Sequence, residues 1–125
     1  MFGIGRSSSN GHSVSSLQRS FTIYGFRTDA NSRESVYMAL IALLENDVYV
    51  TAACKRLAET LGDQNASSRI VACFEDITER TKLVSFSDAI SEWIPHDEAM
   101  LIAAGDEAGD LLKGIREALL LLQNN

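Results

Sequence analysis

Apolar residues recur with a helical period along most of this chain, from residue 32 to residue 122. Spacings of three, four, seven and eight residues place apolar side chains on one helix face, whereas a half-buried strand shows strict alternation. No convincing alternation occurs after residue 30, so the pattern predicts an all-α fold. The recurring positions, which we expect to form the core, are Val36, Leu40, Leu43, Leu44, Val50, Cys54, Leu57, Leu61, Ile70, Phe74, Ile77, Phe86, Ala89, Ile90, Trp93, Ile94, Met100, Leu101, Ala104, Leu111, Ile115, Ala118, Leu119 and Leu122.

Capping residues and helix breakers divide this pattern into about six short helices. The expected boundaries are a cap at Asn31 or Ser32, a stop at Asn46 and Asp47, a stop at Gly62, a cap at Asn65 or Ser67, a cap at Ser85, and Pro95 between the fourth and fifth helices. Short helices with short connections predict a compact antiparallel bundle. Residues 48–53 resemble residues 84–89 in apolar and hydroxyl positions, which two related helical hairpins or chance would both explain.

The segment from residue 104 to residue 111 is the most informative one, because two glycines bracket two adjacent carboxylates between apolar helical stretches. Glycine is unfavourable inside a helix and favourable just past its end, so Gly105 is expected to stop the fifth helix. Asp106 or Glu107 would then begin the next helix, where an acidic side chain satisfies free N–H groups. Gly109, in the first turn of that helix, would allow close backbone approach, and Leu111 would face the core. We therefore predict a tight corner between two helices.

The N-terminal segment differs from the rest in composition. Residues 1–31 are predicted to form a flexible, basic tail rich in serine and glycine, and residues 32–125 to form the helical domain. The first 28 residues carry three arginines and no acidic residue, which leaves 8 basic and 17 acidic residues in the remainder. The aromatic stretch 21–27 could be an extended piece packed on the domain, a disordered piece, or an anchor for anionic lipid.

Composition narrows the class of protein. The chain has 125 residues, a formal net charge of −6 and 46% hydrophobic residues, which suit one globular domain without a basic nucleic-acid footprint. No apolar run approaches the length of a membrane span, and no secretory signal precedes the domain. Cys54 and Cys73 occupy apolar helical positions, so we expect buried free thiols rather than a disulfide or zinc site.

Catalytic patterns are weak in this sequence. There is no nucleophile elbow and no phosphate-binding glycine loop with lysine. Asp106 and Glu107 could form a paired-carboxylate site or, with His96, contribute to a divalent metal site, but capping and surface charge explain them more simply. We therefore expect no enzymatic activity, no cofactor and no bound metal.

Three ordered motifs resemble the inner-membrane platform proteins of type IV pilus assembly and type II secretion, the PilC/GspF family. Residues 38–53 are similar to the family helix "x-L-x-x-L-L-x-x-G-V-x-L-x-x-A", and residues 86–90 to "L-S-x-A-L", with Pro95 after it. Residues 105–111 match the signature "G-E-x-S-G-x-L". Three positions depart from the family: Asp47 replaces the turn glycine, Asp106 the glutamate and Ala108 the serine.

The resemblance implies a non-enzymatic scaffold domain at the cytoplasmic face of the bacterial inner membrane. Its expected partners are the assembly ATPase and inner-membrane assembly proteins, with pilin and a second copy of the chain as further candidates. Gly105, Asp106, Glu107, Gly109 and Leu111 are the candidate contact residues, and Tyr37 and Leu120 are candidates for self-association. Membrane attachment would come from a span of about 20 apolar residues encoded beyond Asn125. The alternative is a free-standing cytoplasmic helical domain that is itself regulatory or that binds a ligand.

Overall fold

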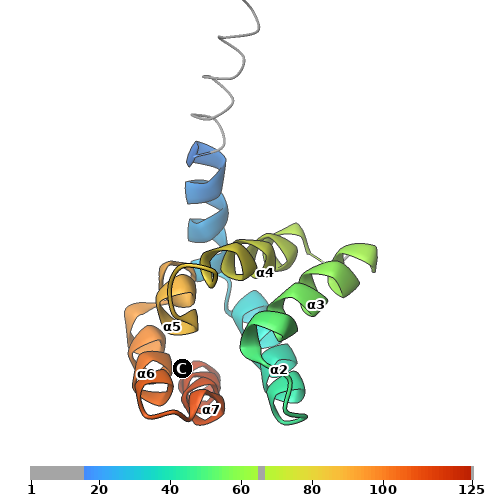
Figure 1. The fold of residues 1–125 in the computed structure, drawn as a ribbon. Coiled ribbons are helices and arrows are strands. Elements are labelled where there is room, and N and C mark those ends of the chain that lie inside the picture. The colour runs from blue at the N-terminus through green and yellow to red at the C-terminus, as the bar shows by residue number, and fades with distance from the viewer. Residues whose placement is uncertain (1–15, 65–66, 125) are drawn as a thin grey trace, which may run out of the picture.

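A computed structural model of the chain describes residues 16–64 and 67–124. All regular secondary structure in these residues is helical, which confirms the all-α prediction (Figure 1). A first helix covers residues 16–27. The elements that follow are α2 (Ala30–Leu44), α3 (Val50–Asp63), α4 (Ser68–Arg80), α5 (Phe86–Ile90), the 3-10 helix η1 (Ser91–Trp93), α6 (His96–Glu107) and α7 (Leu111–Gln123).

The helices pack as neighbouring pairs that share one core. Helices α3 and α4 form one closely packed pair and α6 and α7 another, while α2 packs against both α7 and α3. Figure 1 shows α5, α6 and α7 on one side of the molecule, α2 and α3 on the other, and α4 across one end. The helix formed by residues 16–27 extends away from that end. The predicted compact bundle is therefore confirmed.

The core contains most of the apolar positions predicted from the helical period. The Trp93 side chain is 1% exposed. It packs edge-to-face on Phe26, with ring centroids 5.6 Å apart and an interplanar angle of 81°. Cys54 and Cys73 are buried free thiols, as expected. Burial raises the pKa of Cys54 to about 12 and the pKa of Cys73 well above its ordinary value, because a thiolate is poorly solvated there. Met100 and Ala104 depart from the prediction, since both are exposed, Met100 to 59%.

Residues 16–27 form a helix in place of the flexible or extended piece predicted from the sequence. Ile23 and Phe26 are buried on its inner face, so of the three alternatives the stretch packs on the domain, but as a helix and not as an extended piece. Its outer face leaves Leu17, Phe21 and Tyr24 exposed. The flexibility expected for residues 1–15 lies outside the described residues.

A buried ion pair joins α2 to α6 across the core. Arg33 Nε and Nη2 each donate to the Glu98 carboxylate at 3.0 Å, and the Tyr37 hydroxyl donates to Glu98 Oε1 at 2.6 Å. Arg33 also donates to the backbone carbonyl of Arg27 at 2.6 Å. Burial and the hydrogen bond to Glu98 raise the pKa of Tyr37. Tyr37, expected on the surface, is therefore a core residue and unavailable for self-association.

The predicted caps are partly right. Ser85 accepts the Asp88 N–H at 3.2 Å and caps α5, and Pro95 precedes α6. Ser67 is the N-cap position of α4, while Asn65 lies outside the described residues. The cap of α2 is Asp29, two residues before the earlier of the predicted positions, and its carboxylate accepts from Ser32.

None of the described helices combines the length and the apolar content needed to cross a membrane.

Candidate functional site

The corner between α6 and α7 lies four residues later than the sequence predicted. Helix α6 continues through Gly105, Asp106 and Glu107, and Ala108 is its C-cap. Gly109 has a φ of +76° and is the residue that ends the helix. Asp110 begins α7, because its carboxylate accepts the Lys113 N–H at 3.2 Å. The expected stop at Gly105 and the expected start at Asp106 or Glu107 are both wrong.

Hydrogen bonds at this corner define a Schellman turn. The Gly109 N–H donates to the Asp106 carbonyl at 3.2 Å, and the Asp110 N–H donates to the Gly105 carbonyl at 2.8 Å. A left-handed residue is required at position 109, and glycine adopts this conformation without steric cost. A Cβ at Gly109 would meet nothing within 4 Å, so the predicted role in close packing is wrong for this glycine.

The close approach predicted for the corner occurs instead between Gly105 and Gly114. A Cβ built on Gly105 would lie 2.7 Å from the Gly114 Cα and 2.7 Å from the Asp110 carbonyl oxygen. A Cβ on Gly114 would lie 2.9 Å from the Leu101 carbonyl oxygen. The two helices therefore cross backbone to backbone. Sequence reasoning missed Gly114, although a lone glycine inside a strongly apolar helix is the signal for such a contact.

Asp106 caps a helix, but not the one that was predicted. Its Oδ2 accepts the backbone N–H of Ser87 at 3.1 Å, in the first turn of α5. The carboxylate thus satisfies a free N–H of one helix from the last turn of another, with Ser85 as the second acceptor at the same helix end. Glu107 is exposed, so the two adjacent carboxylates do different things.

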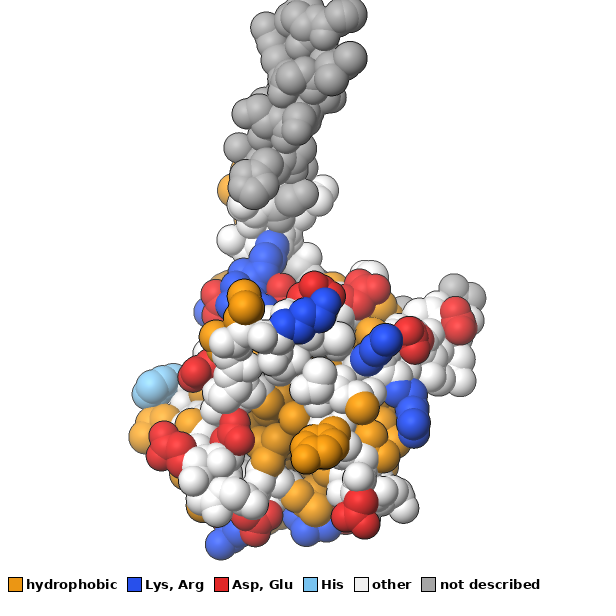
Figure 2. All heavy atoms as spheres, viewed as in Figure 1, with side chains coloured by type: hydrophobic (Ala, Val, Ile, Leu, Met, Phe, Trp, Pro, Cys, Tyr) orange, Lys and Arg blue, Asp and Glu red, His pale blue; other side chains and the backbone are white. Residues whose placement is uncertain are grey.

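A groove brings the corner together with the turn between α2 and α3. It has a volume of about 380 Å³ and is lined by Leu44, Asp47, Val48, Tyr49, Val50, Asp106, Gly109 and Leu111. Three of the five predicted contact residues, Asp106, Gly109 and Leu111, are therefore on its wall. Figure 2 shows hydrophobic side chains gathered on the face between α3 and the α6–α7 pair, with carboxylates around them.

The turn that forms the other wall of the groove has the same geometry as the corner. Asp47 has a φ of +61°, its N–H donates to the Leu44 carbonyl at 3.1 Å, and the Val48 N–H donates to the Leu43 carbonyl at 3.2 Å. This is a second Schellman turn, with aspartate at the left-handed position. Two helix ends of one type thus face each other across the groove.

The metal site considered from the sequence is not assembled. His96 opens α6, whereas Asp106 and Glu107 are in its last turn, which separates them by about 15 Å along the helix axis. Within residues 16–64 and 67–124, no three His, Cys, Asp or Glu side chains lie close enough to hold a metal ion.

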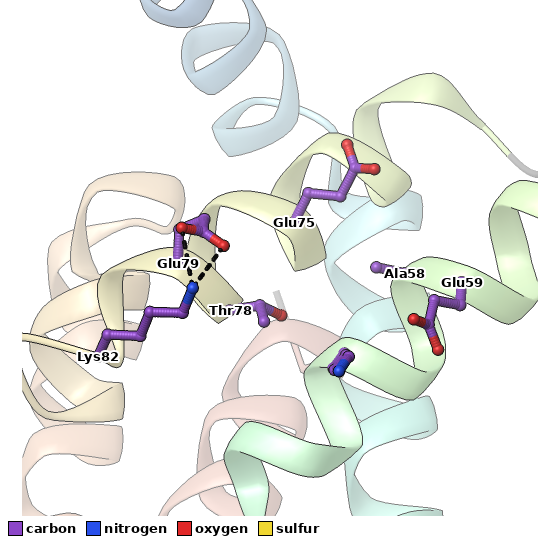
Figure 3. Close-up of a pocket in the computed structure, with 7 residues that line it drawn as sticks. Ala58, Glu59, Glu75, Thr78, Glu79 and Lys82 are labelled. Carbon is purple, nitrogen blue, oxygen red and sulfur yellow. Dashed lines mark hydrogen bonds and ion pairs between the residues drawn. The ribbon is translucent and has the colours of Figure 1, made fainter.

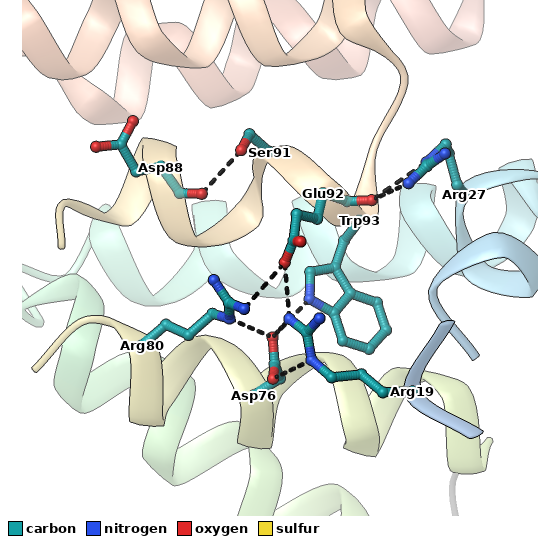
Figure 4. Close-up of polar contacts among 8 residues, drawn as sticks. All are labelled: Arg19, Arg27, Asp76, Arg80, Asp88, Ser91, Glu92 and Trp93. Atoms are coloured by element: carbon teal, nitrogen blue, oxygen red, sulfur yellow. Dashed lines mark hydrogen bonds and ion pairs between the residues drawn. The ribbon is translucent and has the colours of Figure 1, made fainter. Parts of the chain in front are cut away.

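A second polar cluster fixes the first helix to the domain (Figure 4). Arg19 donates to Asp76 at 3.1 and 2.9 Å and to Glu92 at 2.7 Å, while Trp93 Nε1 donates to Asp76 at 2.9 Å. Partial burial opposes ionisation of Asp76, but the Arg19 and Trp93 hydrogen bonds hold its pKa below the usual range. Arg27 donates to the Glu92 carbonyl. The guanidinium groups of Arg19 and Arg27 are therefore both engaged in contacts within the protein.

Another groove lies between α3 and α4, with a volume of about 470 Å³. Its lining mixes two lysines with three glutamates around Ala58 and Thr78: the charged residues are Lys55, Glu59, Glu75, Glu79 and Lys82. Figure 3 shows Lys82 reaching back to Glu79, whose carboxylate accepts at 3.0 and 3.2 Å. Charges of both signs are interspersed here, so this groove favours no one class of ligand.

Comparison of the sequence with family models finds no match, and comparison with curated proteins finds none either.

Proposed function

We propose that this chain is a non-enzymatic scaffold domain of the platform-protein type, which binds an assembly ATPase and inner-membrane partners in type IV pilus assembly or type II secretion. The observation that carries the proposal is the 105–111 segment. Its sequence resembles the sharpest motif of the PilC/GspF family, and Gly105, Asp106 and Gly109 each have a structural task in it.

Those tasks are specific to the residue types in the motif. Gly105 permits the helix crossing, and Gly109 supplies the left-handed turn. Asp106 holds the first turn of α5, where the family glutamate would offer the same carboxylate chemistry on a longer side chain. A motif made of packing and capping residues suits a rigid interaction module, because none of these tasks requires a reacting group.

Binding to the expected machinery tests this proposal directly. The chain should bind the assembly ATPase, or the cytoplasmic part of an inner-membrane partner, from its own organism with a dissociation constant in about the micromolar range. Biolayer interferometry with the immobilised chain measures this, with a heat-denatured sample as control. Failure of every such partner to bind the folded chain would overturn the proposal.

The coding sequence beyond Asn125 gives an independent check. A platform protein should continue into a span of about 20 apolar residues. A gene that encodes no such span would favour the free-standing regulatory domain instead.

A further inference from the structure

We infer that the groove between the α2–α3 turn and the α6–α7 corner binds a basic, apolar segment of a partner protein, in which an aliphatic side chain is flanked by lysine or arginine. The inference rests on the proposed function and names the surface and the chemistry of the partner. It is drawn from the exposure, the charge and the backbone geometry of the groove.

The groove presents an aromatic anchor that the fold does not use. Tyr49 is 85% exposed, although the residues on both sides of it, Val48 and Val50, pack against the core. Leu44 and Leu111 are half-buried and form the rest of the apolar lining. Exposed tyrosines beside an apolar pocket are frequent hot spots in protein interfaces. An aliphatic side chain of the partner would fill this space.

The charge of the groove is of one sign. Asp47 and Asp106 line it, and none of its lining residues is basic. Asp106 uses one oxygen for the Ser87 N–H, and a carboxylate has further acceptor capacity. In the described part of the chain, Asp47 takes part in no ion pair. A partner with lysine or arginine next to its apolar residue would complement both carboxylates.

The backbone at Asp47 supports a role in binding. Its left-handed conformation is one that glycine adopts without cost and aspartate adopts at a cost. Folding alone would favour glycine at this position. The left-handed residue is an acidic one that lines the groove, so its carboxylate is placed where a partner can contact it.

Nuclear magnetic resonance titration tests the groove without any assumption about the partner. Two short peptides share the same leucine positions and carry either lysine or glutamate beside them. The lysine peptide should shift the amide signals of residues 47–50 and 109–111, and the glutamate peptide should not. Equal shifts with both peptides, no shifts with either, or shifts confined to other residues would overturn the inference.

Substitutions with matched controls then test the groove against the biological partner. Tyr49→Ala should weaken binding at least about tenfold, whereas the control Tyr24→Ala, at a tyrosine on the first helix that is 65% exposed, should leave binding unchanged. Asp47→Gly should also weaken binding while the protein becomes at least as stable to urea as the wild type. A merely structural role for Asp47 would leave binding unchanged in this variant.

The outcomes separate the inference from the proposed function. If the chain binds an assembly partner but Tyr49→Ala behaves like Tyr24→Ala, the groove is not the binding surface and the proposed function stands. If no assembly partner binds but the lysine peptide titrates the groove, the proposed function fails and the inference stands. Self-association that Tyr49→Ala abolishes would assign the groove to a second copy and overturn the inference.

Discussion

Replacement of Gly105 by alanine is the sharpest test of the packing that holds the corner. The added Cβ would lie 2.7 Å from the Gly114 Cα and 2.7 Å from the Asp110 carbonyl oxygen. Both obstacles are backbone atoms, so no rotamer change relieves them. Helices α6 and α7 must move apart, and overpacking of this kind costs about 1–3 kcal/mol.

A second effect of the substitution has the opposite sign. Alanine is more favourable than glycine inside a helix by about 1 kcal/mol. Gly62 isolates this term, because it occupies the last turn of α3 just as Gly105 occupies the last turn of α6. The nearest atom to a Cβ at Gly62 is Val71 Cγ1 at 4.0 Å, an open contact. Gly62→Ala should therefore stabilise the protein by up to about 1 kcal/mol.

The experiment measures the difference in the free energy of unfolding between Gly105→Ala and Gly62→Ala. The gain in helix propensity is the same in both variants, so the difference equals the overpacking cost at Gly105. Because both obstacles are backbone atoms, we take the upper half of the overpacking range and expect Gly105→Ala to be less stable than Gly62→Ala by about 2–3 kcal/mol. Urea unfolding reports this through the fluorescence of Trp93, the one tryptophan of the chain, which is buried. If both variants are stabilised equally, α6 and α7 do not cross at the glycines and the account of the corner is wrong.

Three further predictions follow from the polar contacts. Asp106→Ala should cost about 0.5–2 kcal/mol and Asp106→Asn less, because only the asparagine retains an acceptor for the Ser87 N–H; equal losses in urea unfolding would refute the cap. Glu98→Ala should cost about 3–5 kcal/mol, since it leaves the Arg33 guanidinium buried without its carboxylate; a loss below about 1 kcal/mol would refute that pairing. The pKa of Asp76 is lower in the folded than in the unfolded state, so its contribution to stability is present above about pH 4 and is lost as the pH falls through the folded value. Asp76→Asn should flatten this acid limb of the stability curve, and an unchanged limb would contradict the prediction.

The helical period was sufficient to predict the fold class and most of the core. Trp93, Phe74 and Ile115 are buried because helices bury one face, and the period reports that face whatever the neighbours are. Ser85 was predictable as a cap for a similar reason, since a cap bonds within its own first turn. Both features depend on residues close together in the sequence.

Features that depend on distant residues were missed or misplaced. Residues 16–27 were predicted to be flexible because serine and glycine dominate the tail. Arg19 is instead held by Asp76, which lies 57 positions away in the sequence. Glu98 lies in the first turn of α6, but its partner Arg33 is 65 positions away in the sequence. In each case a tertiary contact decides the structure, and local propensity contains no information about it.

The end of α6 was misplaced in the same way, because a contact between residues distant in the sequence decides the role of Gly105. Helix propensity ends α6 at this glycine, but the approach of Gly114 makes glycine the residue that fits inside the helix. The stop therefore moves to Gly109, where the backbone itself requires a left-handed residue. Glycine is therefore required at the two positions of the motif for different reasons, at Gly105 by packing and at Gly109 by backbone conformation, and only the structure distinguishes them.

This division of tasks determines how binding data on the motif should be interpreted. Gly105 and Asp106 set the position of α7 and the start of α5, so their substitution displaces Leu111 and reshapes the groove even if a partner never contacts them. Loss of binding in such variants would report on the shape of the groove. Tyr49 is largely exposed and stabilises no other element through its side chain, so its substitution leaves the groove backbone in place. Substitution of Tyr49 therefore tests direct contact with the partner, whereas substitution of Gly105 or Asp106 tests how far binding depends on the shape of the groove.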